Sequence, residues 1–270
     1  MGSYKLYYLG PRGSFSEEAS LVIKKLYNLD ELIYRNNFNE IFEGVIKNKD
    51  LGLLPIENNH SGSVREIYYL LLEYKPKISV GFDFPIELYL IGKNNIEAKY
   101  VYSHSQALEQ AFNYINKKSL ISIHVSSTSE AVKKVKEEYE KGLYYSYAIG
   151  NKRSARLFNL DIIEKLDIDN NFTRFILIGD HDIEEDNNKT LLIFKVDNKP
   201  GSLYKFLEYF YDNKINLSKI ESIPIRNGTW EYLFILEYEG DKSLIDKEKI
   251  NGEIFYIEDY KYLGIKKYME

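Results

Sequence analysis

Apolar and polar positions follow one repeating order along the first two thirds of the chain: an apolar strand, a short polar loop and an amphipathic helix. In the opening unit, residues 5–9 form the strand, and Ser14 with Glu17 makes a capping box that starts the helix. Later units predict strands at residues 51–56, 78–84, 86–91, 100–102, 120–125 and 143–149. Strands that alternate with helices predict an α/β fold.

The helices are predicted from apolar residues spaced three and four positions apart. They include residues 39–48 and a helix after the loop at residues 103–106, and this spacing places Ile46 and Phe112 on their inward faces. Pro85 suits a segment that crosses between lobes better than a sheet interior. Crossings at residues 78–91 and 167–173 therefore predict two lobes, formed by residues 1–80 plus 167–180 and by residues 86–166.

The last third of the chain follows a different order. Residues 180–189 are polar, lack periodicity and are expected to form a linker. Beyond them the pattern predicts strands at residues 191–196, 217–226, 229–238 and 254–262, helices at 202–212 and 243–250, and a tight turn at Asn227-Gly228. This βαββαβ order predicts a ferredoxin-like domain over residues 190–266.

Composition narrows the classes of function. The 270 residues carry a net charge of −5, so no basic face for nucleic acid is expected. The absence of cysteine excludes disulfides, thiolate catalysis and cysteine-based zinc sites. No secretory signal pattern and no apolar run of membrane-span length is present, which favours a cytoplasmic protein without a membrane partner.

Several strand-to-helix loops end in hydroxyl or amide side chains. Because helix N-termini present free N–H groups and bind anions, convergence of these loops would form a cleft for a small anion. The alternative is simple N-capping, which stabilises a helix by about 1 kcal/mol and requires no ligand. The four histidines lack the helical zinc spacing and are expected in loops or packing positions.

Thr173 and Arg174 stand at the mouth of the apolar run at residues 175–178. A hydroxyl beside a guanidinium suits a carboxylate substrate that must lose a hydroxyl group. Neighbours in a regular strand point to opposite faces. Both side chains therefore reach one ligand only if the strand is irregular there; otherwise Arg174 braces the lobe from behind, or forms a structural ion pair.

Six segments, in this order, resemble the prephenate dehydratase family with a C-terminal ACT regulatory domain. They are Tyr8-Leu9-Gly10-Pro11-Arg12-Gly13-Ser14-Phe15-Ser16, Leu54-Pro55-Ile56-Glu57-Asn58, Ser103-His104-Ser105-Gln106-Ala107-Leu108, Asn171-Phe172-Thr173-Arg174-Phe175, Pro200-Gly201-Ser202-Leu203 and Glu221-Ser222-Ile223-Pro224. The resemblance implies a catalytic domain over residues 1–180 with two lobes like type II periplasmic binding proteins, and the active site between them. It also implies a homodimer or homotetramer with phenylalanine as effector.

The implied reaction converts prephenate to phenylpyruvate, carbon dioxide and water without a metal or organic cofactor. By the family motif, Thr173 assists departure of the hydroxyl, as a hydrogen-bond donor or proton relay. Substrate-binding positions carried over from the family are Asn58, Ser103, which is also expected to cap a helix, Gln110, Arg174 and Ser126. Ser126 stands where some members carry a carboxylate, so a general-acid role is not expected there. Glu57 is expected to orient Arg12 or Arg174, or to form a surface pair.

Effector-binding positions implied by the two ACT motifs are Pro200, Gly201, Ser202, Leu203, Glu221 and Ser222. The start of the helix near Ser202 would bind an amino-acid carboxylate, and Glu221 would bind its ammonium. Ile223 replaces the arginine usual in the family, which weakens the case for phenylalanine binding. The alternative for both motifs is a helix-start turn and a paired strand that form only a dimer interface.

Two other functions remain open on the sequence. Arogenate dehydratase differs from the leading hypothesis only by an amino group on the substrate. A non-catalytic small-acid sensor joined to an ACT module is the alternative from another class, although a sensor needs no complete set of catalytic residues. The catalytic pattern begins at Lys5 without a preceding chorismate mutase-like helical segment, so a monofunctional enzyme is expected.

Overall fold

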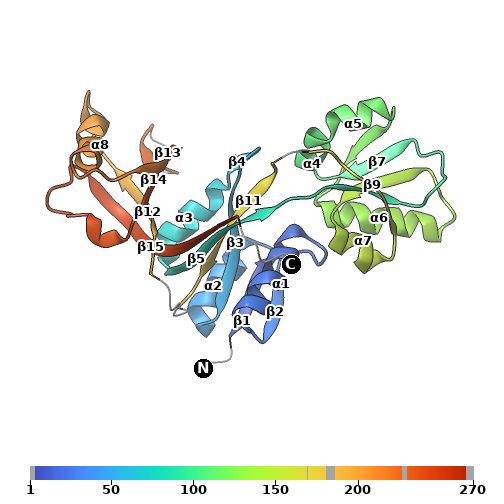
Figure 1. Ribbon diagram of the computed structural model, residues 1–270, viewed down its shortest axis with the longest axis horizontal. Coiled ribbons are helices and arrows are strands. Elements are labelled where there is room, and N and C mark those ends of the chain that lie inside the picture. Colours follow the sequence, from blue (N-terminus) through green and yellow to red (C-terminus); the bar gives the residue numbers. More distant parts are fainter. Residues whose placement is uncertain (1–3, 169, 181–185, 227–229, 266–270) are drawn as a thin grey trace.

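The computed structural model describes residues 4–168, 170–180, 186–226 and 230–265. Figure 1 shows three bodies in a row, with the C-terminal part at one end, a central lobe, and a second lobe at the other end. The predicted Asn227-Gly228 turn lies outside the described residues, as do residues 181–185 of the expected linker. Among the described residues, no helix has both the length and the apolar character needed to span a membrane.

The central lobe places helices on a mixed sheet. Its strands are β1 (Lys5–Leu9), β2 (Glu31–Arg35), β3 (Leu51–Asn58), β4 (Gly62–Ser63), β5 (Ile78–Pro85) and β11 (Phe172–Ile178). Its helices are α1 (Phe15–Leu26), α2 (Phe38–Asn48) and α3 (Arg65–Tyr74). β1, β2 and β3 are parallel, whereas β11 returns antiparallel between β3 and β5. The pattern analysis did not identify β2, whose side chains are only partly buried.

The second lobe has its own five-stranded sheet in the order β10-β6-β9-β7-β8. Its strands are β6 (Tyr89–Gly92), β7 (Tyr100–Ser103), β8 (Ile121–His124), β9 (Ser146–Gly150) and β10 (Asp161–Lys165). Its helices are α4 (Ser105–Gln110), α5 (Phe112–Lys117), α6 (Thr128–Glu140) and α7 (Lys152–Phe158). The two crossings expected at residues 78–91 and 167–173 join the lobes. They lie side by side, and the Ile86 N–H donates to the Asn171 carbonyl at 2.8 Å.

The C-terminal part has the predicted strand arrangement. It contains β12 (Lys189–Lys195), α8 (Ser202–Asp212), β13 (Leu217–Pro224), β14 (Tyr232–Glu239) and β15 (Glu253–Ile265), in the sheet order β13-β14-β12-β15. This order is that of a ferredoxin-like βαββαβ unit. The helix predicted at residues 243–250 is wrong, because only the 3₁₀ turn η1 (Lys242–Leu244) forms there.

β15 joins the C-terminal sheet to the central lobe. Its end runs parallel to β5, where Lys261 pairs with Val80 and Tyr262 with Gly81, so one sheet of ten strands passes through both parts (Figure 1). One buried apolar cluster also includes Tyr68 and Leu71 of α3 together with Ile223 and Ile235 of the C-terminal sheet. The two parts therefore share a core.

Two inward positions predicted for helices are wrong. Ile46 of α2 is 50% exposed and Phe112 is 62% exposed. Phe112 points outward because the expected single helix is interrupted at Ala111 and resumes as α5. The interruption changes the direction of the residues that follow, and three-and-four spacing cannot detect it.

Candidate active site

The predicted convergence of polar loops occurs at one cavity between the lobes. This cavity of about 280 Å³ is lined by residues at the starts of α1, α4 and α6, and by the ends of β3 and β11. Its size is near the lower end of small-molecule pockets, about 300 Å³, which suits a compact acid. Apart from the titratable His104, the described residues that line it include no charged side chain.

Thr173 and Asn58 face each other in this cavity. They are paired across β11 and β3, and the Asn58 Nδ2 donates to the Thr173 Oγ1 at 3.0 Å. Asn58 Oδ1 accepts the backbone N–H groups of His60 and Ser61 at 2.9 and 3.0 Å. These backbone donors fix which end of the Asn58 amide is oxygen. Thr173 therefore accepts from Asn58, and its own hydroxyl hydrogen is left to be donated elsewhere.

A chain of amides extends from this pair to the second lobe. Asn58 Nδ2 also donates to Asn171 Oδ1 at 2.9 Å, and Asn171 Nδ2 donates to Gln110 Oε1 at 2.9 Å. Asn171 is only 4% exposed and lies at the return crossing between lobes. It belongs to the recognised motif, yet its side chain was not among the predicted site residues, because a motif does not show which amides meet.

Ser126 and Gln110 also line the cavity, but Ser103 does not. The predicted N-cap role of Ser103 is wrong, since His104 is the N-cap of α4. Ser103 ends β7, is fully buried and donates to the Ile149 carbonyl at 2.7 Å. Its short hydroxyl bonds to the neighbouring strand and so does not reach the cavity.

His104 lines the cavity, whereas the sequence analysis expected the histidines only in loops or packing positions; it lies in the loop between β7 and α4. Its Nδ1 accepts the Gln106 N–H at 3.4 Å. Burial lowers the pKa of His104 below its ordinary value, and the nearby His124 adds to this effect. A lowered pKa favours the neutral imidazole at pH 7. In the sequence, the position of His104 directly after Ser103, at the end of a strand, was the signal that could have identified it as a cavity residue.

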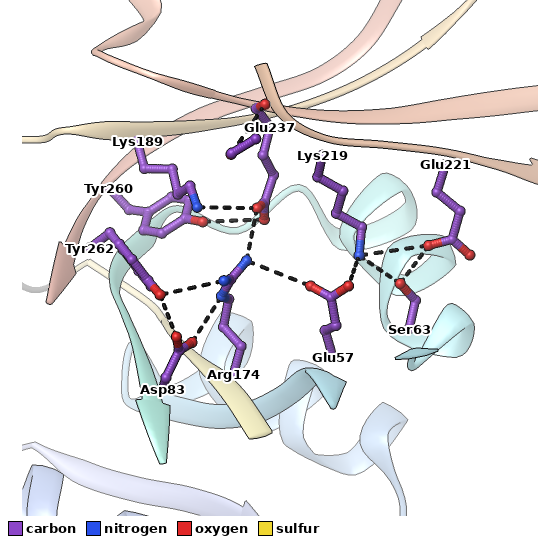
Figure 2. A network of polar contacts seen from close by, with 11 residues as sticks. Glu57, Ser63, Asp83, Arg174, Lys189, Lys219, Glu221, Glu237, Tyr260 and Tyr262 are labelled. Atoms are coloured by element: carbon purple, nitrogen blue, oxygen red, sulfur yellow. Dashed lines mark hydrogen bonds and ion pairs between the residues drawn. The ribbon is translucent and has the colours of Figure 1, made fainter. Parts of the chain in front are cut away.

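Arg174 points to the opposite face of the sheet, as the regular alternation of a strand requires. Its Nε lies 3.0 Å from Asp83 Oδ1 and its Nη1 lies 3.0 Å from Glu237 Oε2 (Figure 2). Arg174 is not among the residues that line the cavity. Burial alone would lower the pKa of Arg174, but Glu237 and Asp83 outweigh it and raise the pKa. The expectation that Arg174 contacts substrate conflicts with this geometry. Of the two partners expected for Glu57, it contacts Arg174, at 3.5 Å.

The residues expected at an effector site lie on different surfaces of one protomer. Gly201 is the N-cap of α8 at φ 84°, a left-handed conformation that suits glycine. Pro200 and Ser202 line a depression beside it. Glu221 instead contacts Lys219 and Arg65, toward α3, while its neighbour Ser222 is exposed. Leu203 lines a separate hollow with Trp230 and Tyr232.

The lobes are in contact beside the cavity. Arg153 of α7 binds the Glu17 carboxylate of α1 through Nη2 at 3.2 Å and Nε at 3.3 Å. The Arg153 backbone N–H donates to Glu18 Oε1 at 3.1 Å. Ser129 Oγ donates to the Arg12 carbonyl, which adds a contact between α6 and the first loop. Among the described residues, no group of three or more acidic or histidine side chains could hold a metal ion.

Comparison with known proteins identifies the family. The family model described as "Prephenate dehydratase" matches residues 6–183. Prephenate dehydratase of Methanocaldococcus jannaschii is 38% identical over 248 residues, covering 89% of this chain and 90% of that protein. Bifunctional chorismate mutase/prephenate dehydratase of Aquifex aeolicus is 33% identical over 261 residues, covering 93% of this chain and 69% of that protein.

A solved structure shares the fold. Prephenate dehydratase of Arthrobacter aurescens in complex with L-Phe has a TM-score of 0.80 and 22% identity, over 95% of this chain and 90% of that one. The two sequence matches cover 89% and 93% of this chain. The chain therefore belongs to the prephenate dehydratase family and is an enzyme of that hydro-lyase class.

Proposed function

We propose that the cavity between the lobes is the active site, and that Thr173 donates its hydroxyl hydrogen to the departing hydroxyl group of prephenate. The observation that carries this proposal is the fixed orientation of Asn58, whose amide nitrogen donates to Thr173 Oγ1. Because Asn58 donates to the threonine oxygen, the hydroxyl hydrogen of Thr173 remains for donation to the substrate. The alternative role of Thr173 as a β-branched strand residue does not require such a partner.

The proposed reaction breaks two bonds of prephenate. The bond from the ring to the carboxylate breaks and releases carbon dioxide, and its electron pair enters the ring. The ring becomes aromatic as the carbon–oxygen bond breaks, and the hydroxyl takes up a proton to leave as water. Because a threonine hydroxyl is a weak acid, Thr173 acts by hydrogen bonding or by relaying a proton that it regains from solvent.

Substrate binding relies on neutral groups. Asn58, Gln110 and Ser126 supply amide and hydroxyl groups from both lobes. The first turns of α1 and α6 add backbone N–H groups and the positive ends of two helix dipoles, which suit the carboxylates of prephenate. We do not assign Ser103 and Arg174 direct contact with substrate, because neither lines the cavity.

The test is incubation of the full chain with prephenate while the absorbance of phenylpyruvate is followed in alkali. Turnover of prephenate is expected, and a parallel reaction with arogenate decides between the two dehydratase activities. Tight prephenate binding without product from either substrate would instead support the small-acid sensor and overturn the proposed mechanism.

We also propose that residues 190–266 form an ACT domain that binds phenylalanine and controls the catalytic domain of residues 1–180. The ferredoxin-like strand order and the left-handed Gly201 at the start of α8 support this assignment. The Arthrobacter aurescens relative is described as a complex with L-Phe. Because Glu221 and Ser202 face different surfaces here, we propose that a second copy completes the effector site in a cytoplasmic homodimer or homotetramer.

Calorimetry with phenylalanine and size-exclusion chromatography test this regulation. Binding, a change in activity and an oligomer larger than one chain are expected. An Ile223→Arg change is not a clean test of the missing arginine, because Ile223 is fully buried in the core shared with α3. An arginine there would lose solvation and destabilise the protein. Failure of the wild-type chain to bind phenylalanine would overturn the regulatory proposal.

A further inference from the structure

Charged residues of the C-terminal sheet contact the back of the proposed catalytic pair. Arg174 follows Thr173 on β11, and Glu57 precedes Asn58 on β3. The two charged residues are paired across the same strands as the two polar ones. Since neighbouring strand residues point to opposite faces, Thr173 and Asn58 face the cavity. Arg174 and Glu57 point toward the residues of the C-terminal sheet, as Figure 2 shows.

Lys219 of β13 provides the contact nearest to Asn58. Its Nζ lies 2.8 Å from Glu57 Oε1 and 3.6 Å from Glu221 Oε2, and it donates to Ser63 Oγ at 2.6 Å. The Lys219 side chain is only 9% exposed. Loss of this cation would remove the partner that the two carboxylates share, and would leave Glu57 paired with Arg174 alone and Glu221 with Arg65 alone.

Glu237 of β14 provides the second contact. Its side chain is 1% exposed, and its Oε2 lies 3.0 Å from Arg174 Nη1 and 3.5 Å from Lys189 Nζ. Its Oε1 accepts the Tyr260 hydroxyl at 3.3 Å. Glu57 Oε2 lies 3.5 Å from the same Arg174 Nη1. The contacts therefore form one connected set, from Lys219 through Glu57 and Arg174 to Glu237.

The strands need this support because their pairing is irregular at this point. Arg174 pairs with Glu57, but the next residue, Phe175, pairs with Pro55, so Ile56 is skipped. Such a bulge separates the last pairs of a ladder from its regular part. On its other side β11 pairs regularly with β5 at this point, where Thr173 lies opposite Phe84. The bulge therefore affects the β3 side, and the position of Asn58 relative to Thr173 depends more on the side chains behind the two strands.

We propose that Lys219, acting through Glu57, is a positioning residue for the Thr173–Asn58 pair, contributed by the C-terminal domain. This inference rests on the catalytic roles proposed for those two residues. Because Lys219 belongs to β13, the active site is incomplete without this strand. Lys219 also provides a direct path by which a change at β13 alters turnover.

Lys219→Met tests the proposal, with Lys219→Arg as rescue and Lys133→Met, an exposed lysine of α6, as control. We expect Lys219→Met to lower kcat about fivefold or more, as for typical coupling between sites, with little change in KM. Lys219→Arg should restore kcat because it keeps the charge, and Lys133→Met should match wild type. Wild-type kcat in Lys219→Met would overturn the proposal.

Hydrogen exchange separates this proposal from the proposed function. Lys219→Met should speed amide exchange at residues 57–64 and 170–175, whereas Lys219→Arg and Lys133→Met should not. This measurement is decisive even if wild type turns over neither prephenate nor arogenate, a result that would overturn only the proposed function. Should Lys219→Met fail to fold, Glu57→Gln removes the same ion pair, and unchanged exchange in it would overturn the positioning role.

Discussion

Thr173 and Arg174 are adjacent residues with separate surroundings. Thr173 accepts the Asn58 amide hydrogen at the cavity, whereas Arg174 contacts Asp83 and Glu237 behind the sheet. The pair identifies the motif in the sequence, and strand alternation alone already indicated that Arg174 and Thr173 point to opposite faces of a regular strand. Which member lines the cavity, and which contacts carboxylates far away in the sequence, follows only once the strands are placed.

Thr173→Val removes the hydroxyl while keeping a β-branched side chain. We expect kcat to fall at least about 100-fold, the lower range for general acid–base catalysis, with KM within a few-fold of wild type. Thr173→Ser is the matched control, because it keeps the hydroxyl, and it should retain most activity in the phenylpyruvate assay. Equal kcat for Val and wild type would contradict the proposed role.

Glu18 makes the contact between lobes sensitive to pH. Burial raises the pKa of Glu18 from 4.5 to about 7, although the Arg153 N–H opposes this shift. Between pH 4.5 and 7, Glu18 therefore keeps a proton in the folded state that it has lost in the unfolded state. The stability that this proton contributes is fully present below pH 4.5 and is lost as the pH rises through 7.

Glu18→Gln should remove this contribution to the pH dependence. We expect the melting temperature of the variant to fall less than that of wild type between pH 4.5 and 8, and to exceed it at pH 8. Glu137→Gln, at an exposed position of α6, is the control. Differential scanning calorimetry at several pH values measures the melting temperatures of both variants and of wild type. If the melting temperatures of Glu18→Gln and wild type change with pH in parallel, the raised pKa of Glu18 is contradicted.

Elements differ in how far local sequence defines them. Ser14 caps α1 as its local pattern predicts, since its hydroxyl accepts the Glu17 N–H, although the Glu17 carboxylate accepts the Gly13 N–H and not that of Ser14. The strands and first helix of the C-terminal part also follow their local pattern, and only the 3₁₀ turn η1 stands where the second helix was predicted. β2 and the interruption at Ala111 were missed because β2 is partly exposed and the helix keeps its apolar spacing. The predicted helix at residues 243–250 fails because its polar run lacks a continuous apolar face.

Gly81 tests the pairing of β5 with β15. A Cβ at this position would lie 2.5 Å from Cε2 of the Tyr260 ring. We therefore expect Gly81→Ala to lower the free energy of unfolding by about 1–3 kcal/mol, the usual cost of overpacking. In a double-mutant cycle measured by urea unfolding, Tyr260→Leu should reduce this effect. Strict additivity of the two changes would show that the ring is not the cause.

The whole molecule depends on contacts that no local pattern reveals. The cleft was predicted correctly because strand-to-helix loops converge in open α/β sheets. The joining of the C-terminal sheet to β5, and the core it shares with α3, link residues far apart in the chain. Such pairings depend on burial between domains, so amphipathic spacing within either domain does not define them.

Removal of the C-terminal part should destabilise the catalytic part. A chain of residues 1–183 keeps the matched family region but loses the apolar partners of α3 and the strand beside β5. We expect a lower melting temperature, binding of a hydrophobic dye and loss of most prephenate turnover, compared with the full chain. A fragment as stable and active as the full chain would contradict the shared core.

The position of β15 also has a consequence for the order of synthesis. β5 is complete once residue 85 has been made, but its partner on one side contains residues 261–265. Until those residues leave the ribosome, one edge of β5 has unpaired N–H and C=O groups. The nascent chain is therefore open to pairing with other chains at this edge until residues 261–265 have emerged.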